Sequence, residues 1–247
     1  MTKYRELTEK PRRLFAIGDI HGCPDELEFL LEYLRNTLNI DDQDQVVFIG
    51  DYIDRGVSSK AVLECLLRFQ KLQPKTIFLR GNHEDMLLGF LGFEGRGGAY
   101  LANGGDVFFE SYGIKEFKTP TDARERIPAS HISFLLNLDR YVISDSYVFA
   151  HAGLDPLRDL HSQLDQDLFW IRDPFIENIH NFNRTVLFGH TPYQDLLLHL
   201  PYKIGIDTGL VYGNILTCVE LMNEQVYQVK AGGTKVEVSS FKEKALG

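Results

Sequence analysis

Residues 13–22, RLFAIGDIHG, join an apolar run to a loop of glycines and metal-ligand residue types. The apolar part, residues 13–17, is short and ends at a glycine, which predicts a buried strand. The loop places Asp19 and His21 directly after that strand. In an open α/β sheet, ligand sites form at the carboxyl ends of strands, because loops from several strands converge there. We therefore expect this stretch to form one corner of a functional site.

The same pairing of strand and helix recurs along the first half of the chain. Residues 25–38 carry leucines at three- and four-residue spacing, which predicts a helix that covers a face of the sheet. A second strand is predicted over 46–49, a second helix over 58–72 with Ser58 as its N-cap, and a third strand over 76–79. Alternating strands and helices of this kind predict an α/β fold with a buried sheet.

The second half of the chain is richer in strands. After a helix predicted over 130–138, strands are predicted over 141–143, 147–150, 186–188, 203–206, 215–220 and 226–229. Between residues 93 and 113, a dense set of glycines with aromatics indicates an irregular or mobile segment, which either shapes access to a site or only packs as a loop. A polar tail over 239–247 is expected to fray.

Composition restricts the partners and the compartment. The chain has 247 residues, 44% of them hydrophobic and 25% charged, as in ordinary soluble globular proteins. Its net charge of -9 gives no general attraction to nucleic acid or to anionic lipid, so we expect neither as a partner. Three cysteines argue against a disulfide framework, and the first thirteen residues lack the apolar core of an export signal. The cytoplasm is the expected compartment.

Four further predicted strand ends carry the signature of residues 18–22. They read GDYIDRG at 50–56, GNHE at 81–84, AHAG at 150–153 and GHTP at 189–192. Asp, His and Asn are ligands for hard or borderline divalent metals such as Mn, Fe and Zn. Six such residues exceed the needs of one open catalytic ion and suit two ions about 3.5–4 Å apart. One Asp or His at a strand end is more often a turn former, but five motifs in order reverse that expectation.

In these residues the chain resembles the phosphoprotein phosphatases, a branch of the calcineurin-like metallophosphoesterases, in their bacterial and phage-like form. The match consists of GDIHG at 18–22, GDYIDRG at 50–56, RGNHE at 80–84, HAG at 151–153 and GH at 189–190, in the family's order. The resemblance implies two mixed β-sheets packed together and flanked by helices. It also implies a catalytic domain over 13–230, with terminal extensions 1–12 and 231–247.

The resemblance implies a role for each matched site residue. The implied ligands of the metal pair are Asp19 and His21 on the first ion, Asp51 between the two ions, and Asn82, His151 and His190 on the second. His83 would be the general acid, and Asp54 would orient it. Arg55 would clamp the phosphate, because the planar guanidinium fork meets two phosphate oxygens at once. Arg172, in the weaker match WIRD at 170–173, would be a second clamp or would pair with an acid on a solvated loop.

The implied reaction is phosphomonoester hydrolysis. A metal-bound hydroxide attacks phosphorus in line while His83 protonates the departing alkoxide. Mn is the metal we expect to work in vitro, with Fe and Zn as alternatives. A thiolate phosphatase of the Cys-x5-Arg type is excluded, because the residues six positions after the cysteines are Phe29, Lys71 and Glu224.

Three functions remain open from the sequence. The first is a serine/threonine protein phosphatase, in a strict or a dual-specificity form, acting on a phosphoprotein or a phosphorylated small molecule. The second is a hydrolase of diadenosine tetraphosphate or another phosphoanhydride, which presents the same transferring phosphoryl group. The third is a non-catalytic scaffold, which should have lost a ligand or the acid. No obligatory regulatory subunit is expected, since the long C-terminal extension of eukaryotic members is missing.

Several residues near the motifs are assigned no catalytic role. Arg80 is expected to form a structural ion pair, and residues 207–209 are expected to support the site without touching substrate. The histidines outside the motifs show no ligand pattern and are expected at the surface; they are His131, His161, His180 and His199.

Overall fold

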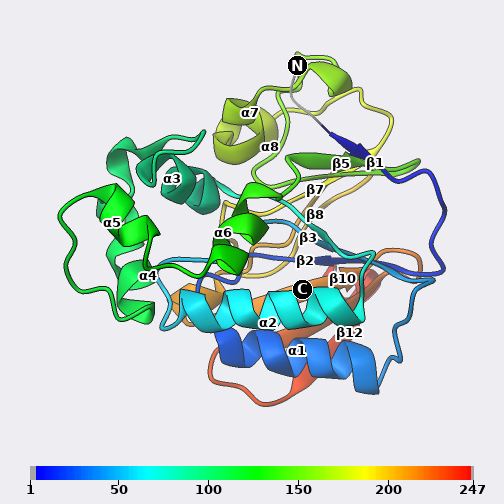
Figure 1. The fold of residues 1–247 in the computed structure, drawn as a ribbon. Helices are drawn as coiled ribbons and strands as arrows, with labels where there is room; N and C mark the ends of the chain where they lie inside the picture. Colours follow the sequence, from blue (N-terminus) through cyan, green and yellow to red (C-terminus); the bar gives the residue numbers. More distant parts are fainter. Residues whose placement is uncertain (1–3, 246–247) are drawn as a thin grey trace.

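Two mixed β-sheets face each other in the computed structural model, which describes residues 4–245 (Figure 1). The first sheet has the order β12-β11-β10-β2-β3-β4. Its strands are β2 (Leu14–Ile17), β3 (Gln45–Phe48), β4 (Ile77–Phe78), β10 (Ile215–Glu220), β11 (Gln225–Lys230) and β12 (Val236–Ser240). The strands β2, β3 and β4 are parallel to one another, while β10 is antiparallel to β2. Three consecutive motif-bearing loops therefore leave the same edge of this sheet.

The second sheet has the order β1-β5-β6-β7-β9-β8. Its strands are β1 (Arg5–Glu6), β5 (Tyr141–Ile143), β6 (Tyr147–Ala150), β7 (Thr185–Phe188), β8 (Leu197–His199) and β9 (Lys203–Gly205). The strands β6 and β7 are parallel, so the loops after them leave one edge of this sheet together.

Side chains alternate along β2 between two cores. Phe15 and Ile17 belong to the core that includes Leu27 and Leu30 of α1 (Pro24–Asn36), which covers the outer face with α2 (Ser59–Leu72). Leu14 and Ala16 point the other way, into the core between the two sheets. This period of two is the one expected of a strand that is buried on both faces. Figure 1 shows α1 and α2 side by side against the β2–β10 sheet.

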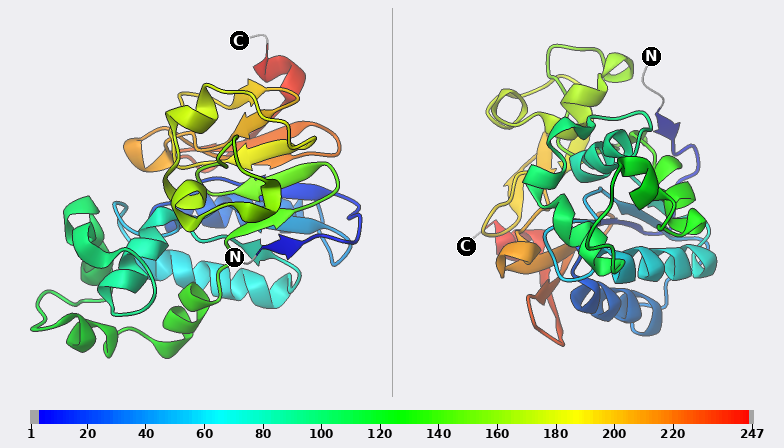
Figure 2. Two further views of the ribbon diagram at one scale, coloured as in Figure 1. Left: turned by 90° about the horizontal axis from the view of Figure 1, so that it is seen from above. Right: turned by 60° about the vertical axis from the view of Figure 1, so that its left-hand side comes forward.

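The remaining helices gather around the loops that leave the sheets. Figure 2 shows the green segment from α3 to α5 projecting to one side of the two sheets. These elements are α3 (Asn82–Phe90), η1 (Gly97–Ala99), η2 (Leu101–Asn103), α4 (Gly105–Ser111), α5 (Pro120–Arg124), α6 (Ala129–Leu136), η3 (Leu160–Ser162), α7 (Asp165–Trp170), α8 (Asp173–Ile176) and η4 (Leu210–Tyr212). Between residues 4 and 245, no helix has the length and apolar character needed to cross a membrane.

The predicted α/β architecture of two mixed sheets with flanking helices is confirmed. Ser58 caps α2 as predicted, since its side chain accepts a hydrogen bond from the Ala61 amide. Within residues 93–113, the irregular structure predicted from the glycines is found as two short 3₁₀ turns, but the last part, α4, is a regular helix. The domain bounds 13–230 stay a prediction.

The predicted fraying of residues 239–247 is wrong over the part of it that the structure describes. Residues 239 and 240 complete β12, which pairs with β11, and α9 (Phe241–Lys244) follows. Phe241 is buried in the core between the sheets, and the Lys244 ammonium lies 2.8 Å from the Asp195 carboxylate. Tertiary contacts of this kind leave little signal in a polar stretch. Residues 246–247 lie outside the described chain.

Candidate metal centre

The five motif loops converge between the two sheets. Asp19 follows β2, Asp51 follows β3, and Asn82 follows β4, all in the first sheet. His151 follows β6 and His190 follows β7, both in the second sheet. The structure therefore brings side chains from both sheets to one point, and these are the residue types expected there.

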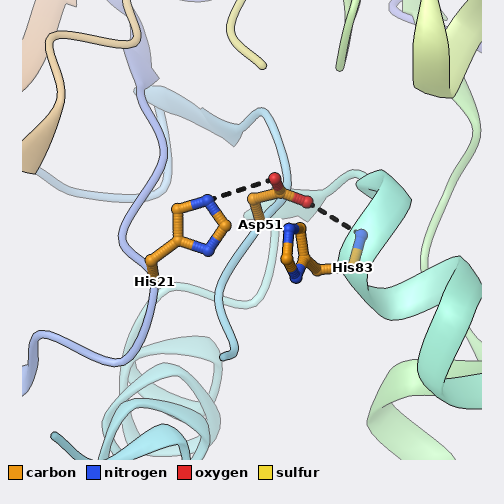
Figure 3. A group of neighbouring side chains, drawn as sticks. All are labelled: His21, Asp51 and His83. Atoms are coloured by element: carbon orange, nitrogen blue, oxygen red, sulfur yellow. Dashed lines mark hydrogen bonds and ion pairs between the residues drawn. The ribbon is translucent and has the colours of Figure 1, made fainter. Parts of the chain in front are cut away.

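Asp51 lies at the centre of the cluster. One of its carboxylate oxygens, Oδ2, is 3.3 Å from His21 Nε2, and the other, Oδ1, is 3.4 Å from His151 Nε2. The backbone amide of His83 also donates to Oδ1, at 3.1 Å. Figure 3 shows Asp51 between His21 and His83, with its contacts to the His21 ring and to the His83 amide dashed. A carboxylate that faces two histidines on opposite sides has the geometry of a bridging ligand.

Asn82 joins the two histidines of the second sheet. Its Oδ1 is 3.0 Å from His151 Nε2 and 3.0 Å from His190 Nδ1. Ligand atoms of Asp51, His151 and His190 all lie within 4.8 Å of one another, as one ion requires. A second such group is His21, Asp51 and His83, in which His83 stands where Asp19 was expected.

Backbone carbonyls fix the tautomers of two histidines. His21 Nδ1 lies 2.9 Å from the Ile53 carbonyl oxygen, and His151 Nδ1 lies 2.9 Å from that of Ile49. A carbonyl only accepts, so each Nδ1 carries the proton. The Nε2 lone pair of each ring is left pointing toward Asp51, which is how metal-binding histidines are usually oriented.

The cluster holds more negative charge than its own side chains can neutralise. Asp19 Oδ1 is buried and has no hydrogen-bond partner among residues 4–245, while its Oδ2 accepts from the His190 amide at 3.0 Å. Burial, followed by the charges of Asp207 and Asp51, raises the pKa of Asp19 well above its usual range. His190 Nε2 is also buried and has no hydrogen-bond partner among the described residues. Buried ligand atoms without a hydrogen-bond partner in the described chain, next to crowded carboxylates, are suited to binding divalent cations. The residues therefore fit a divalent metal centre of the kind that the motifs predict.

Glycines allow this crowding. A Cβ on Gly189 would stand 2.0 Å from Asp19 Oδ1, and one on Gly81 would stand 2.1 Å from Asp51 Oδ1. Neither gap admits a methyl group. The glycines before Asn82 and His190 are thus required by the approach of a ligand oxygen to the backbone.

The backbone itself is strained at the site. Of the eight non-glycine residues with positive φ in the described chain, five belong to the predicted site: His21, Asp51, Asp54, Arg55 and His190. Such conformations cost of order 1–3 kcal/mol each and persist only where the surroundings enforce them. Glu84, to which the sequence assigns no role, supplies part of that enforcement. Its carboxylate accepts from the amides of Gly81, Asp51 and Tyr52, at 2.9, 3.0 and 2.8 Å.

His83 and Asp54 form a buried pair beside the ligands. His83 Nδ1 lies 2.7 Å from Asp54 Oδ2, and His83 Nε2 has no partner in the described chain. Burial lowers the pKa of the His83 imidazole and raises that of the Asp54 carboxyl. Both shifts disfavour separate charges, so the pair retains one proton between its members over a wide pH range.

Comparison with known proteins shows the family to which the chain belongs. Residues 12–215 match the family model described as calcineurin-like phosphoesterase. The chain belongs to this family. The phosphoesterase is 31% identical over 207 residues to serine/threonine-protein phosphatase 2 of Salmonella typhimurium, covering 80% of this chain and 88% of the relative. It is 25% identical over 245 residues to the asymmetrical bis(5'-nucleosyl)-tetraphosphatase PrpE of Oceanobacillus iheyensis, covering 88% and 92%.

Solved structures agree on the fold of the phosphoesterase. A cold-active protein tyrosine phosphatase superposes with a TM-score of 0.68 at 17% identity, covering 96% of this chain and 80% of that one. At that identity the likeness concerns the fold alone. The family assignment makes the protein a hydrolase with a divalent metal centre.

Two arginines of the phosphoesterase border the centre. Arg55 is exposed, its Nη1 lies 2.9 Å from His21 Nε2, and its guanidinium lies 5.8 Å from the Tyr212 ring centroid. Arg172 is also exposed and donates to the His190 carbonyl at 3.2 Å. Among the described residues Arg172 has no ion pair, so the alternative of pairing with an acid is not found.

The predictions for Arg80 and for the four histidines outside the motifs are confirmed in part. Arg80 forms the predicted structural ion pair, 3.6 Å from Asp85. The prediction of surface positions is wrong for His131 and His180, which are both buried; His131 Nδ1 contacts the Tyr112 hydroxyl at 2.5 Å. It is confirmed for His161 and His199. Aromatic neighbours cover the two buried rings, and no motif in the sequence reports that.

Proposed function

We propose that this phosphoesterase is a two-metal phosphomonoester hydrolase that acts as a serine/threonine protein phosphatase. One observation carries the hydrolase part of the proposal: Asp51 faces histidines from both sheets, with a buried His–Asp pair beside it. A structural site needs neither a partnerless imidazole nitrogen nor strained ligands. The proposal places the enzyme in the cytoplasm, which its three free cysteines support.

The proposed ligands are those named from the motifs. They are Asp19 and His21 for one ion, Asp51 for both, and Asn82, His151 and His190 for the other. When bound, two divalent ions would supply a water of lowered pKa and would neutralise charge on the phosphoryl group. We propose Mn as the metal that supports activity in vitro, with Fe and Zn as alternatives.

Side chains that are not metal ligands bind the phosphate and deliver the proton. Arg55 and Arg172 are exposed and lie on either side of the ligand cluster, where they can hold phosphate oxygens. His83 delivers a proton from Nε2 to the leaving oxygen, while Asp54 holds Nδ1.

The choice of substrate rests on two relatives whose similarity to this chain is comparable. Serine/threonine-protein phosphatase 2 of Salmonella typhimurium, at 31% identity, supports a phosphoprotein. The tetraphosphatase relative, at 25% identity over a longer stretch, supports a dinucleotide polyphosphate. The site geometry is the same for both, because each presents a phosphoryl group with one leaving oxygen. A dinucleotide tetraphosphatase is therefore the second candidate.

Phosphate release by chelator-treated protein, with and without added Mn, tests the proposal. The substrates are a phosphoserine peptide, a phosphotyrosine peptide and diadenosine tetraphosphate. We expect Mn to restore turnover of the phosphoserine peptide, Asp51→Asn to abolish it, and Asp42→Asn, an exposed acid-to-amide change at the far end of β3, to leave it intact. Preference for the dinucleotide would establish the second candidate, and no turnover of any substrate with metal bound would favour a scaffold.

A further inference from the structure

The glycine-rich segment, residues 93–113, reaches the buried His–Asp pair through one side chain. Tyr100 lies between η1 and η2 and is only 1% exposed. Its hydroxyl donates to Asp54 Oδ1 at 2.7 Å, while Asp54 Oδ2 faces His83 Nδ1 at 2.7 Å. The three side chains therefore form one hydrogen-bonded chain that begins in the glycine-rich segment and ends at His83.

The ring of Tyr100 is held firmly enough to aim its hydroxyl. It packs against Phe90 and Phe109, with ring centroids 5.5 and 6.1 Å away. Gly105 lies so close to the ring that a Cβ there would stand 2.5 Å from it. The same turn touches the active-site loop again, since a Cβ on Gly104 would stand 3.3 Å from Arg55 Cγ. The glycines of this segment thus let it close over Asp54 and Arg55.

Asp54 depends on Tyr100 because few other groups hold its carboxylate. The residue is fully buried, so no water competes for its oxygens. In the described chain, its recorded carboxylate contacts are the Tyr100 hydroxyl on Oδ1 and His83 on Oδ2. Removing the hydroxyl would leave one buried carboxylate oxygen without a donor. The carboxylate could then turn about its χ2 bond, and His83 would lose its fixed partner.

We propose that Tyr100 is a positioning residue for His83, acting through Asp54, and that the glycine-rich segment serves proton delivery in this way. The inference rests on the proposed function, in which His83 is the general acid. The recorded contacts of Tyr100 in the described chain include none of the proposed ligands, and the side chain is buried. Its loss should therefore slow those reactions that need a proton at the leaving oxygen and should spare those that do not.

Tyr100→Phe tests this with two substrates of different leaving groups. A phosphoserine peptide releases an alkoxide and needs the proton; p-nitrophenyl phosphate releases a stable phenolate and hardly needs it. We expect kcat on the peptide to fall about 10-fold, on the scale of other supporting partners of active groups, and kcat on p-nitrophenyl phosphate to change by less than about 2-fold. Because both rates are measured on one Mn-loaded preparation, their ratio does not depend on the folded fraction.

Two companion variants make the outcomes separable. Tyr112→Phe removes another hydroxyl of the same segment, one that contacts His131 instead of Asp54, and should leave both rates unchanged. His83→Asn should show a stronger form of the selective loss. If His83→Asn slows both substrates equally, the acid role in the proposed function is wrong. If His83→Asn is selective but Tyr100→Phe slows both substrates equally or neither, the role of Tyr100 is overturned and that of His83 stands.

Discussion

The two ends of the strands β2 and β3 differ in how their buried carboxylates are neutralised. At their amino ends, Arg12 and Arg13 both bind the buried Asp44 carboxylate, with nitrogen to oxygen distances of 2.5 and 2.6 Å. At their carboxyl ends, Asp19 and Asp51 are buried together, and Asp19 Oδ1 has no hydrogen-bond partner in the part of the chain that the structure describes. The same pair of strands thus carries a neutralised cluster at one end and an unbalanced cluster at the other.

The pKa shifts show what the difference means for stability. Burial alone would raise the pKa of Asp44, but hydrogen bonds from Arg13 and Arg12 bring it well below its usual range. Burial and neighbouring carboxylates move the pKa of Asp19 the other way. A lowered carboxyl pKa means that ionisation stabilises the fold, and a raised one means that ionisation destabilises it. The ionised Asp44 carboxylate therefore supports the fold, while ionisation of Asp19 opposes it, and bound cations can relieve that cost.

The largest effect on activity is expected when a carboxylate is removed at the carboxyl ends of β2 and β3. Asp19→Asn should lower activity more than about 100-fold, beyond the loss that supporting residues cause. In EDTA, however, the same change should raise the melting temperature by about 2–4 °C for each kcal/mol of repulsion removed. The gain should grow as pH rises from about 4, the pKa of an unfolded Asp, toward the raised folded pKa, because over that range the unfolded carboxyl ionises while the folded Asp19 must keep its proton.

Calorimetry of the EDTA-treated proteins at pH 4.5 and pH 8, beside a Mn-dependent activity assay, checks both halves. A melting temperature that falls on Asp19→Asn in EDTA at pH 8 would mean that the carboxylate is stabilising without metal. The contrast between the two strand ends would then be lost.

A smaller effect is expected from Gly189→Ala. The added Cβ would meet Asp19 Oδ1 at 2.0 Å and must displace it, which should weaken metal binding and activity about 10–100-fold. Gly98→Ala is the matched control, since a Cβ there meets nothing within 4 Å. Titration of activity against Mn concentration measures the shift. Equal Mn dependence of the two variants would show that Asp19 is not held by the backbone that follows β7.

The smallest effect is expected at the neutralised end. Asp44→Asn should cost about 1–2 kcal/mol at pH 7, mainly through the lost charge-assisted hydrogen bonds from Arg13; solvent screens the contact to Arg12, whose side chain is 43% exposed. Because the folded pKa of Asp44 is lowered, its contribution is present above the unfolded pKa of about 4 and is lost as pH falls through the folded pKa.

Urea unfolding of both proteins at pH 7 and pH 3 measures this contribution. The difference in unfolding free energy should shrink at the lower pH, while Mn-dependent activity per folded molecule stays unchanged at pH 7. A gap that widens at pH 3 would contradict the lowered pKa.

The arrangement of side chains at the carboxyl ends of the motif strands is the part of the structure that the sequence predicts best. The five motifs predict that side chains from distant segments meet, because parallel strands must end at a shared edge. Asp51 and His83, which follow the parallel neighbours β3 and β4, are found together on that basis. The partnership of Asp54 with His83 is likewise found as the resemblance implies, at 2.7 Å.

The residues that the sequence does not reveal are those whose role comes from a tertiary contact. Nothing in the local pattern around Tyr100 indicates that its hydroxyl reaches Asp54, because the two belong to different loops. His180 is buried against Phe175 and Phe182, and no motif around it in the sequence indicates that contact. Residues 236–240 form β12 only because β11 offers an edge. Side-chain periodicity predicts faces of elements but not which distant element covers them.

The position of β2 inside its sheet has a consequence for how the chain is assembled. β2 pairs with β3 on one side, soon after it in sequence, and with β10 on the other, near the end of the chain. During synthesis from the amino terminus, β2 therefore keeps one open edge until most of the chain has been made. Open edges recruit strands from other chains, and distant partners close slowly. The nascent protein is thus most exposed to aggregation when most of its polypeptide already exists and β10 has yet to dock.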